Sequence, residues 1–123
     1  MPSANAILPS SVRTTTTDGA ITTGATIPTQ TNHSYLVVAR VIVTDGSTTA
    51  GYIRAATFEN NAGTLGQVGA TTSIATHEDI AAPMDVVFDT SGTDIRVRIT
   101  GDPGRSLVWQ IDLEVRQAAA IGS

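Results

Sequence analysis

The sequence predicts an all-β fold, an antiparallel β-sandwich of jelly-roll-like type with an extended N-terminal arm. Short segments rich in β-branched and alternating apolar residues follow one another along the chain. Clusters of Gly, Asn, Asp and Pro separate them, and no segment has a convincing helical period. With 123 residues the chain suits one domain that buries roughly two thirds of its unfolded surface. We divide it into an arm or edge strand (1–30), the sandwich (31–117) and a flexible C-terminal tail (118–123).

The first segment, residues 1 to about 19, is polar and contains Pro2, Pro9 and the run Thr14 to Thr17. Such a segment buries too little apolar surface to order itself, so it is either an arm that docks on another subunit or a disordered tail. Residues 20–27 alternate weakly and predict an edge strand, with Gly24 as a bulge or weak point.

The most apolar segment, YLVVARVIV at residues 35–43, predicts a central strand that ends at Asp45-Gly46. Both of its faces are apolar except at Arg40, so we expect both to be buried. A second sheet, a helix or a neighbouring subunit would have to cover the second face.

Further strands are expected at 51–59 and 64–74. In the first of these, Tyr52, Arg54, Ala56 and Phe58 share one face. Residues 77–83 suit either a short helical turn or a loop that crosses between sheets.

Three strands are expected in the last third, at 84–89, 94–100 and 106–116. The last two alternate, and this places apolar side chains on the inner face: Ile95, Val97, Ile99, Leu107, Trp109, Ile111, Leu113 and Val115. Trp109 is the largest of them and is the expected core anchor.

Composition excludes several classes of protein. The net charge is −4 and every basic residue is an arginine, so the dense basic face that a nucleic-acid binder needs is missing. No apolar run approaches the roughly 20 residues that span a bilayer, and the first residues do not resemble a signal peptide, so we expect a soluble protein. There is no cysteine, and only 15% of residues are charged, which favours a surface partly covered by partners.

Candidate catalytic and ligand-binding residues are scarce. His77-Glu78-Asp79 is the one cluster of ligand-type side chains, too few for a typical zinc site, and the turn aspartates lack calcium-loop spacing. No nucleophile elbow or phosphate-binding glycine pattern occurs. We therefore expect no catalytic residue, metal or cofactor, and no enzymatic activity.

Residues 34–116 resemble a β-rich structural module of tailed-bacteriophage virion proteins of the decoration or tail-fibre-like kind. The matching segments are GYIRAATF at 51–58, Gly63 to Thr72, THED at 76–79 and DVVFDTSGTDIRVRITG at 85–101. The segment after the central strand, 45–50, is shorter than in many relatives, and most relatives carry the module on a longer chain, whereas this one is expected to be free-standing.

The resemblance implies a virion location and leaves two functions open. The first is a capsid decoration or cement protein, a homotrimer on the head surface that binds across major capsid subunits. The second is a receptor-binding or tail-fibre tip module that contacts a host glycan, although the expected loops contain no aromatic residue for stacking. The residues expected at contacts between subunits are arginines, which suit bidentate pairing: Arg40, Arg54, Arg96, Arg98 and Arg116.

Overall fold

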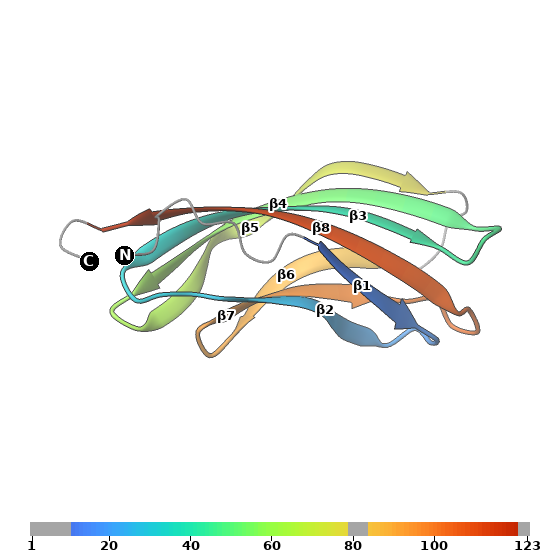
Figure 1. Cartoon of the computed structure of the whole chain (residues 1–123), viewed down its shortest axis with the longest axis horizontal. Helices are drawn as coiled ribbons and strands as arrows, with labels where there is room; N and C mark the ends of the chain where they lie inside the picture. Colours follow the sequence, from blue (N-terminus) through green and yellow to red (C-terminus); the bar gives the residue numbers. More distant parts are fainter. Residues whose placement is uncertain (1–10, 79–83, 121–123) are drawn as a thin grey trace.

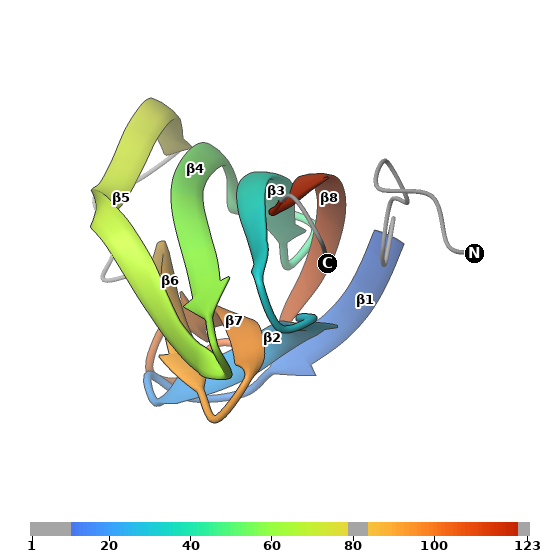
Figure 2. The same ribbon diagram turned by 90° about the vertical axis from the view of Figure 1, so that its left-hand side faces the viewer.

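The computed structural model describes residues 11–78 and 84–120, which form two packed antiparallel sheets (Figures 1 and 2). The strands of the larger sheet, in spatial order, are β1 (Ser11–Thr16), β8 (Leu107–Ala119), β3 (His33–Thr44), β4 (Thr49–Asn61) and β5 (Thr64–Glu78). Those of the smaller sheet are β2 (Ile21–Pro28), β7 (Asp94–Thr100) and β6 (Asp85–Ser91). The described residues contain no helix, so the predicted all-β antiparallel sandwich is confirmed.

The strands divide five to three between the sheets, whereas a jelly roll divides eight strands evenly, so the jelly-roll detail is not confirmed. The chain passes between the sheets at 17–20, at 29–32 and at 101–106. The expected turn or loop at 77–83 is partly replaced by strand, because His77 and Glu78 end β5. The rest of that segment lies outside the described residues.

Residues expected in the N-terminal arm belong to the sheet of their own chain. Ser11 pairs with Asp112 and Thr16 with Leu107, which makes β1 the edge strand beside β8. The second half of the arm is β2, an edge strand of the smaller sheet, and its register shifts between Thr23 and Ala25. The shift lies at Gly24, where the sequence predicts a bulge or weak point. At the other end of the chain, β8 extends to Ala119, two residues into the segment expected to be a flexible tail.

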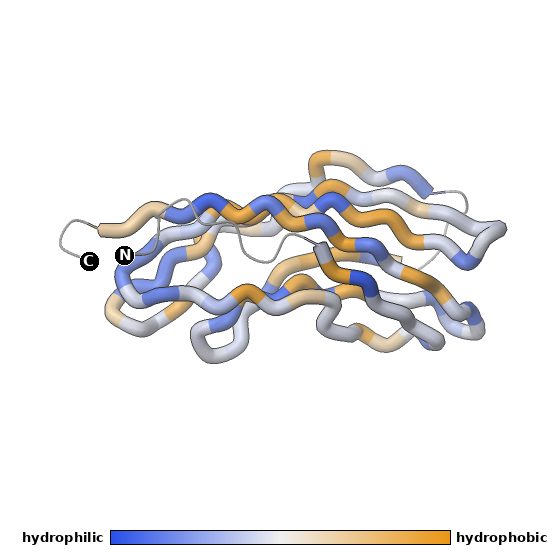
Figure 3. Tube along the Cα trace, viewed as in Figure 1, coloured by the Kyte–Doolittle hydropathy of each residue, from blue (hydrophilic) through white to orange (hydrophobic). Residues whose placement is uncertain are grey.

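The core lies between the two sheets and contains the apolar side chains that alternation placed there. The inner residues of β7 and β8 are all buried: Ile95, Val97, Ile99, Leu107, Trp109, Ile111, Leu113 and Val115. Figure 3 shows the hydrophobic segments along β8 and the strands beside it. Trp109 is 0% exposed, and its Nε1 donates to Thr16 Oγ1 over 2.8 Å, which ties β8 to β1 from inside the core.

The central strand β3 is buried on one face only, so the expectation of two buried faces is wrong for the isolated chain. Tyr35, Val37 and Val43 point into the core, whereas Leu36 is 45% and Ile42 is 54% exposed. The physical reason is that the smaller sheet covers one face of the larger one, and the described part of the chain provides no helix or third layer for the other (Figure 2). We call this uncovered surface of the five-stranded sheet the open face.

Gly101 is required where the chain leaves β7 for β8. A Cβ added there would meet the carbonyl oxygen of Asp18, on the crossing from β1 to β2, and, at 2.8 Å, the Oγ1 of Thr16 at the end of β1. We expect Gly101→Ala to lower the free energy of unfolding by about 1 to 3 kcal/mol in urea denaturation, as overpacking does. Gly66→Ala is the matched control, because nothing lies within 4 Å of its added Cβ. Equal midpoints for the two variants would contradict this packing.

Candidate interaction surfaces

The open face is built from the residues of β8, β3 and β4 that point away from the core. The antiparallel register places them in rows across the sheet: Gln110, Ile42 and Gly51; Asp112, Arg40 and Ile53; Glu114, Val38 and Ala55; Arg116, Leu36 and Thr57. Apolar side chains lie along β3 and β4, but the exposed Arg40 lies between Val38 and Ile42 on β3, and charged side chains lie beside them on β8. Two further exposed apolar residues, Val68 and Ile74, lie on β5 at the edge of the same sheet.

The charges of the open face are balanced and lie close together. Arg40 Nη1 is 3.4 Å from Glu114 Oε1, and Arg116 Nη2 is 3.1 Å from Glu114 Oε2. The side chains of Arg40 and Arg116 are 56% and 64% exposed. Exposed ion pairs of this kind contribute about 0 to 1 kcal/mol to stability, so these arginines are not needed for the fold.

Arg96 and Arg98 lie on the outside of the other sheet and already have partners in the chain. Arg96 makes a bidentate pair with Asp89, in which both N to O distances are 2.8 Å. This pairing raises the pKa of the Arg96 guanidinium above its ordinary value. Arg98 donates to Thr23 Oγ1 over 2.5 Å. Arg96 and Arg98 therefore lie on the opposite side of the sandwich from Arg40 and Arg116.

Arg54 lies inside the sandwich, 6% exposed, and is not available at the surface. Its Nε donates to the carbonyl oxygen of Val86 on β6 over 3.2 Å, and its Nη1 donates to that of Ala75 on β5 over 2.7 Å. The guanidinium is stacked over the Tyr52 ring, 4.9 Å from its centroid, and Nη2 is 3.7 Å from Asp85. Arg54 thus joins β4 and β5 of the larger sheet to the free edge of β6. Its position on the Tyr52 and Phe58 face was visible in the sequence, but its role as an internal clamp was not.

The cluster at 77–79 is only partly described, and Glu78 has a structural partner. The Tyr52 hydroxyl donates to Glu78 Oε2 over 2.8 Å and also lies 3.3 Å from the carbonyl oxygen of Met84. Burial raises the pKa of the Tyr52 phenol well above its usual range, and the hydrogen bond to Glu78 adds to that shift. Within 11–78 and 84–120, no three His, Cys, Asp or Glu side chains come together as a metal site.

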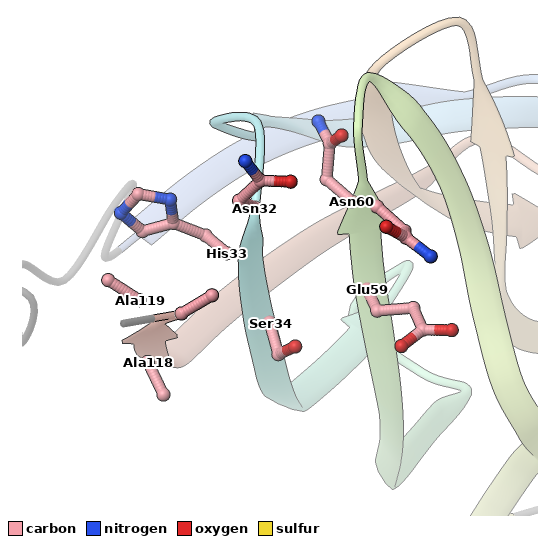
Figure 4. Close-up of a pocket in the computed structure, with 9 residues that line it drawn as sticks. Asn32, His33, Ser34, Glu59, Asn60, Ala118 and Ala119 are labelled. Carbon is pink, nitrogen blue, oxygen red and sulfur yellow. The ribbon is translucent and has the colours of Figure 1, made fainter. Parts of the chain in front are cut away.

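A pocket of about 240 Å³ lies where β8 ends beside the start of β3 and the end of β4 (Figure 4). Asn32, at φ 63°, organises it. Its N–H donates to Asn60 O over 2.7 Å, its carbonyl accepts from the N–H of Ala120 over 2.9 Å, and its Oδ1 accepts from the N–H of Ala62 over 3.0 Å. Four polar side chains also line the pocket: His33, Ser34, Glu59 and Asn61. These groups suit a small hydroxylated or amide-bearing ligand.

Asp45 connects the loops at the end of the sandwich opposite to this pocket. Its Oδ1 accepts from the N–H groups of Ser47 over 2.9 Å and Thr48 over 2.6 Å, and its Oδ2 accepts from Arg105 Nη1 over 3.2 Å. Arg105 also pairs with Asp102 at 2.7 Å, so one arginine connects the β3–β4 loop with the β7–β8 crossing. The backbone hydrogen bonds from Thr48 and Ser47 lower the pKa of Asp45 to about 2.

This shift predicts an acid-sensitive contribution from Asp45 to stability. The folded-state pKa lies below the unfolded value of 3.8, so the unfolded chain binds the proton more readily. The stabilisation is complete above about pH 4 and is lost as pH falls towards 2. In thermal melts across this range, we expect the difference in Tm between the native chain and Asp45→Asn to shrink as pH falls. A difference independent of pH would contradict the depressed pKa.

The aromatic side chains offer no platform for a sugar ring. Every Trp, Tyr and Phe of the chain is buried: Tyr35, Tyr52, Phe58, Phe88 and Trp109. Phe58 and Phe88 pack edge to face across the two sheets, with centroids 5.9 Å apart. Any contact with a glycan would therefore depend on polar groups.

Comparison with known proteins shows a likeness of fold. No family model matches the chain, and no curated protein matches it in sequence. The tailspike protein of Acinetobacter baumannii phage AM24 superposes on 93% of this chain with a TM-score of 0.53 at 8% sequence identity. The tailspike of Acinetobacter phage vB_ApiP_P1 aligns over 93% with a TM-score of 0.37 at 14% identity. This chain spans 27% and 22% of the lengths of those proteins.

No helix that could cross a bilayer occurs among the described residues.

Proposed function

We propose that the chain is a structural module of a phage tail component of the tailspike type. The observation that carries the proposal is the shared fold, since nearly the whole chain superposes on about a quarter of the AM24 tailspike. The expectation from the sequence, a β-rich module of phage virion proteins, agrees with this proposal at a coarse level. A virion location, on the tail rather than the head, follows from this proposal.

The role proposed for the module is contact between proteins, without catalysis. The open face exposes Leu36 and Ile42 together with charged side chains on β3 and β8, and this mixture suits a protein partner. Capsid decoration, the first expectation from the sequence, has no specific support in these comparisons. The expected homotrimer, the contact with the major capsid protein and the lack of enzymatic activity stay predictions.

Contact with a host surface glycan is the second candidate function, and the polar side chains in the pocket at Asn32 favour it. The pocket offers an imidazole, a hydroxyl, a carboxylate and an amide in a corner that backbone hydrogen bonds hold in place. In this role the module would bind sugar hydroxyls through hydrogen bonds, because the aromatic side chains are buried.

The location is tested by separating the tails and heads of disrupted phage particles and quantifying the chain in each fraction by mass spectrometry. We expect the chain in the tail fraction, at a constant ratio to the other tail proteins. Recovery with the heads would support decoration instead and would overturn the proposal. Binding of the labelled purified chain to host cells, compared between the native chain and Glu59→Gln, tests the glycan function separately.

A further inference from the structure

Strand β8 is much longer than β1, the described strand beside it on one side. The pairing of β1 with β8 extends as far as Ser11 and Asp112, whereas β8 runs on to Ala119. In Figure 1, β1 accordingly lies beside only one end of β8. Of the described strands, β3 alone pairs with residues 113–119. We infer that the other edge of residues 113–119 is a strand-acceptor site, and that residues 4–10 of the same chain occupy it as a continuation of β1.

The hydrogen-bonding pattern shows which backbone groups of β8 point to this site. The N–H of Ala120 donates to the carbonyl oxygen of Asn32 over 2.9 Å, towards β3, and the register of β8 with β3 is unbroken. Consecutive residues of a strand direct their backbone groups to opposite sides, so those of Leu113 and Val115 point away from β3. Their side chains are 4% and 2% exposed, so the site adjoins the core. Backbone groups there need partners, because an unpaired polar group away from water is costly.

The ten residues that precede Ser11 have the length and the prolines that suit this site. Continuing the register of β1 sets residues 10 to 4 opposite residues 113 to 119. Only the even-numbered residues of the added strand then direct their N–H groups to β8. Pro9 has no N–H and falls at an outward-directed position, and Pro2 lies beyond the end of β8. Both prolines therefore stand where an edge strand tolerates them.

The side chains of the added strand alternate in phase with those of β1. Val12 packs against the core, and Leu8 is on the same face four residues earlier. Leu8 pairs with Val115 and extends an inward row of buried side chains across β8, β3 and β4. Ile7 points the other way and pairs with the exposed Arg116 on the open face. The segment is ordered by this pairing with β8, as the neighbouring residues of β1 are.

The same chain is the favoured donor of this strand. Residue 10 is joined to Ser11, which is already paired beside the site, so no loop has to be closed. A strand of a second copy or of another protein would compete with a segment that is tethered at the site. The added strand closes an edge that would otherwise recruit strands of other chains. This inference does not depend on the proposed role in a phage tail.

A designed disulfide tests the register and the donor chain together. The chain has no cysteine, so Ile7→Cys combined with Arg116→Cys introduces the only two thiols. The two residues form a non-hydrogen-bonded pair with Cα atoms about 4.5 Å apart, which a disulfide can span. The matched control combines Ile7→Cys with Ala118→Cys. Its second thiol is on the same face but two residues further along β8, about 7 to 8 Å away, which is too far.

Non-reducing electrophoresis after mild oxidation distinguishes the outcomes of this test. We expect at least tenfold more disulfide within one chain from the Ile7 and Arg116 pair than from the Ile7 and Ala118 pair. Disulfides that join two chains would mean that the segment docks on another copy, which overturns the inference. Equal oxidation of the two variants, or no disulfide in either, would show that residues 4–10 do not follow this register.

Amide hydrogen exchange, measured for each residue by NMR, tests the pairing in the chain without cysteines. We expect the amides of Leu113 and Val115 to be as protected as that of Glu114, which points to β3. Leu8→Pro removes an N–H directed at β8 and should speed exchange at Val115 at least tenfold. Ile7→Pro is the matched control, because it removes an outward N–H and should change this rate little. Rapid exchange of Leu113 and Val115 in the native chain, or equal effects of the two prolines, would contradict the inference.

Discussion

Replacing Trp109 with alanine is expected to lower the free energy of unfolding by about 3 to 5 kcal/mol, the range typical of truncating a large buried aromatic residue. Trp109 is fully buried at the junction of β8, β1 and the core, and it is the largest of the fully buried side chains. The truncation would leave a cavity and would also remove the partner of Thr16 Oγ1. Urea denaturation followed by circular dichroism measures the change, because the variant lacks the chain's single tryptophan.

Two milder variants separate packing from hydrogen bonding at this position. Trp109→Phe keeps much of the apolar contact and is expected to cost clearly less than the alanine variant. Thr16→Val leaves Trp109 in place but removes the acceptor of its Nε1–H, which should cost about 1 to 3 kcal/mol for a buried donor without a partner. Equal denaturation midpoints for Trp109→Ala and the native chain would show that Trp109 is not the core anchor.

Arg54→Ala is expected to cost about 2 to 4 kcal/mol, the second largest effect. The substitution removes charged hydrogen bonds to the carbonyl oxygens of Val86 and Ala75 and leaves both without this donor inside the sandwich. It also removes the cation that stacks on the Tyr52 ring. Because these contacts connect β4 and β5 with β6, we further expect faster amide hydrogen exchange in β6.

Arg40→Ala is the matched control for this prediction. Arg40 lies on the neighbouring strand β3 with an exposed side chain, and its ion pair with Glu114 should contribute about 0 to 1 kcal/mol. Both variants remove an arginine side chain, and the two arginines lie on adjacent strands. The difference between their losses of stability therefore measures what the buried position of Arg54 contributes. Equal losses of stability would mean that Arg54 is not a clamp between the sheets.

Much of the fold follows from local patterns in the sequence. In 94–100 and 106–116, apolar and polar residues alternate cleanly, so a half-buried strand can place its apolar side chains in the core in only one way. The structure buries every apolar side chain that this arrangement places inside. Gly24 interrupts a weakly alternating segment, and the structure has a register shift there. Turn residues such as Asp45-Gly46 end strands because they satisfy the backbone locally, which does not depend on the rest of the fold.

The parts that could not be predicted depend on contacts distant in sequence. The threonine-rich segment at 11–16 has little apolar character of its own, and it is ordered by pairing with β8, almost a hundred residues away. The residues around Arg54 are apolar on both faces of the strand, so their pattern does not decide which face is buried. Arg54 is internal because β6 packs against its face. The apolar outer face of β3 shows that a cover is needed but not whether the cover belongs to the same chain.

The reactivity of a thiol at Val38 in intact tails tests most directly whether the open face is the working surface of this module. Val38→Cys and Val87→Cys would each be assembled into particles and treated with a maleimide, alongside the same variants as isolated, diluted chains. We predict that Val38→Cys reacts at least tenfold more slowly in the tail than in the diluted chain, whereas Val87→Cys changes little. Equal reactivity of Val38→Cys in both states would mean that the open face remains exposed to solvent in the particle, which contradicts the account.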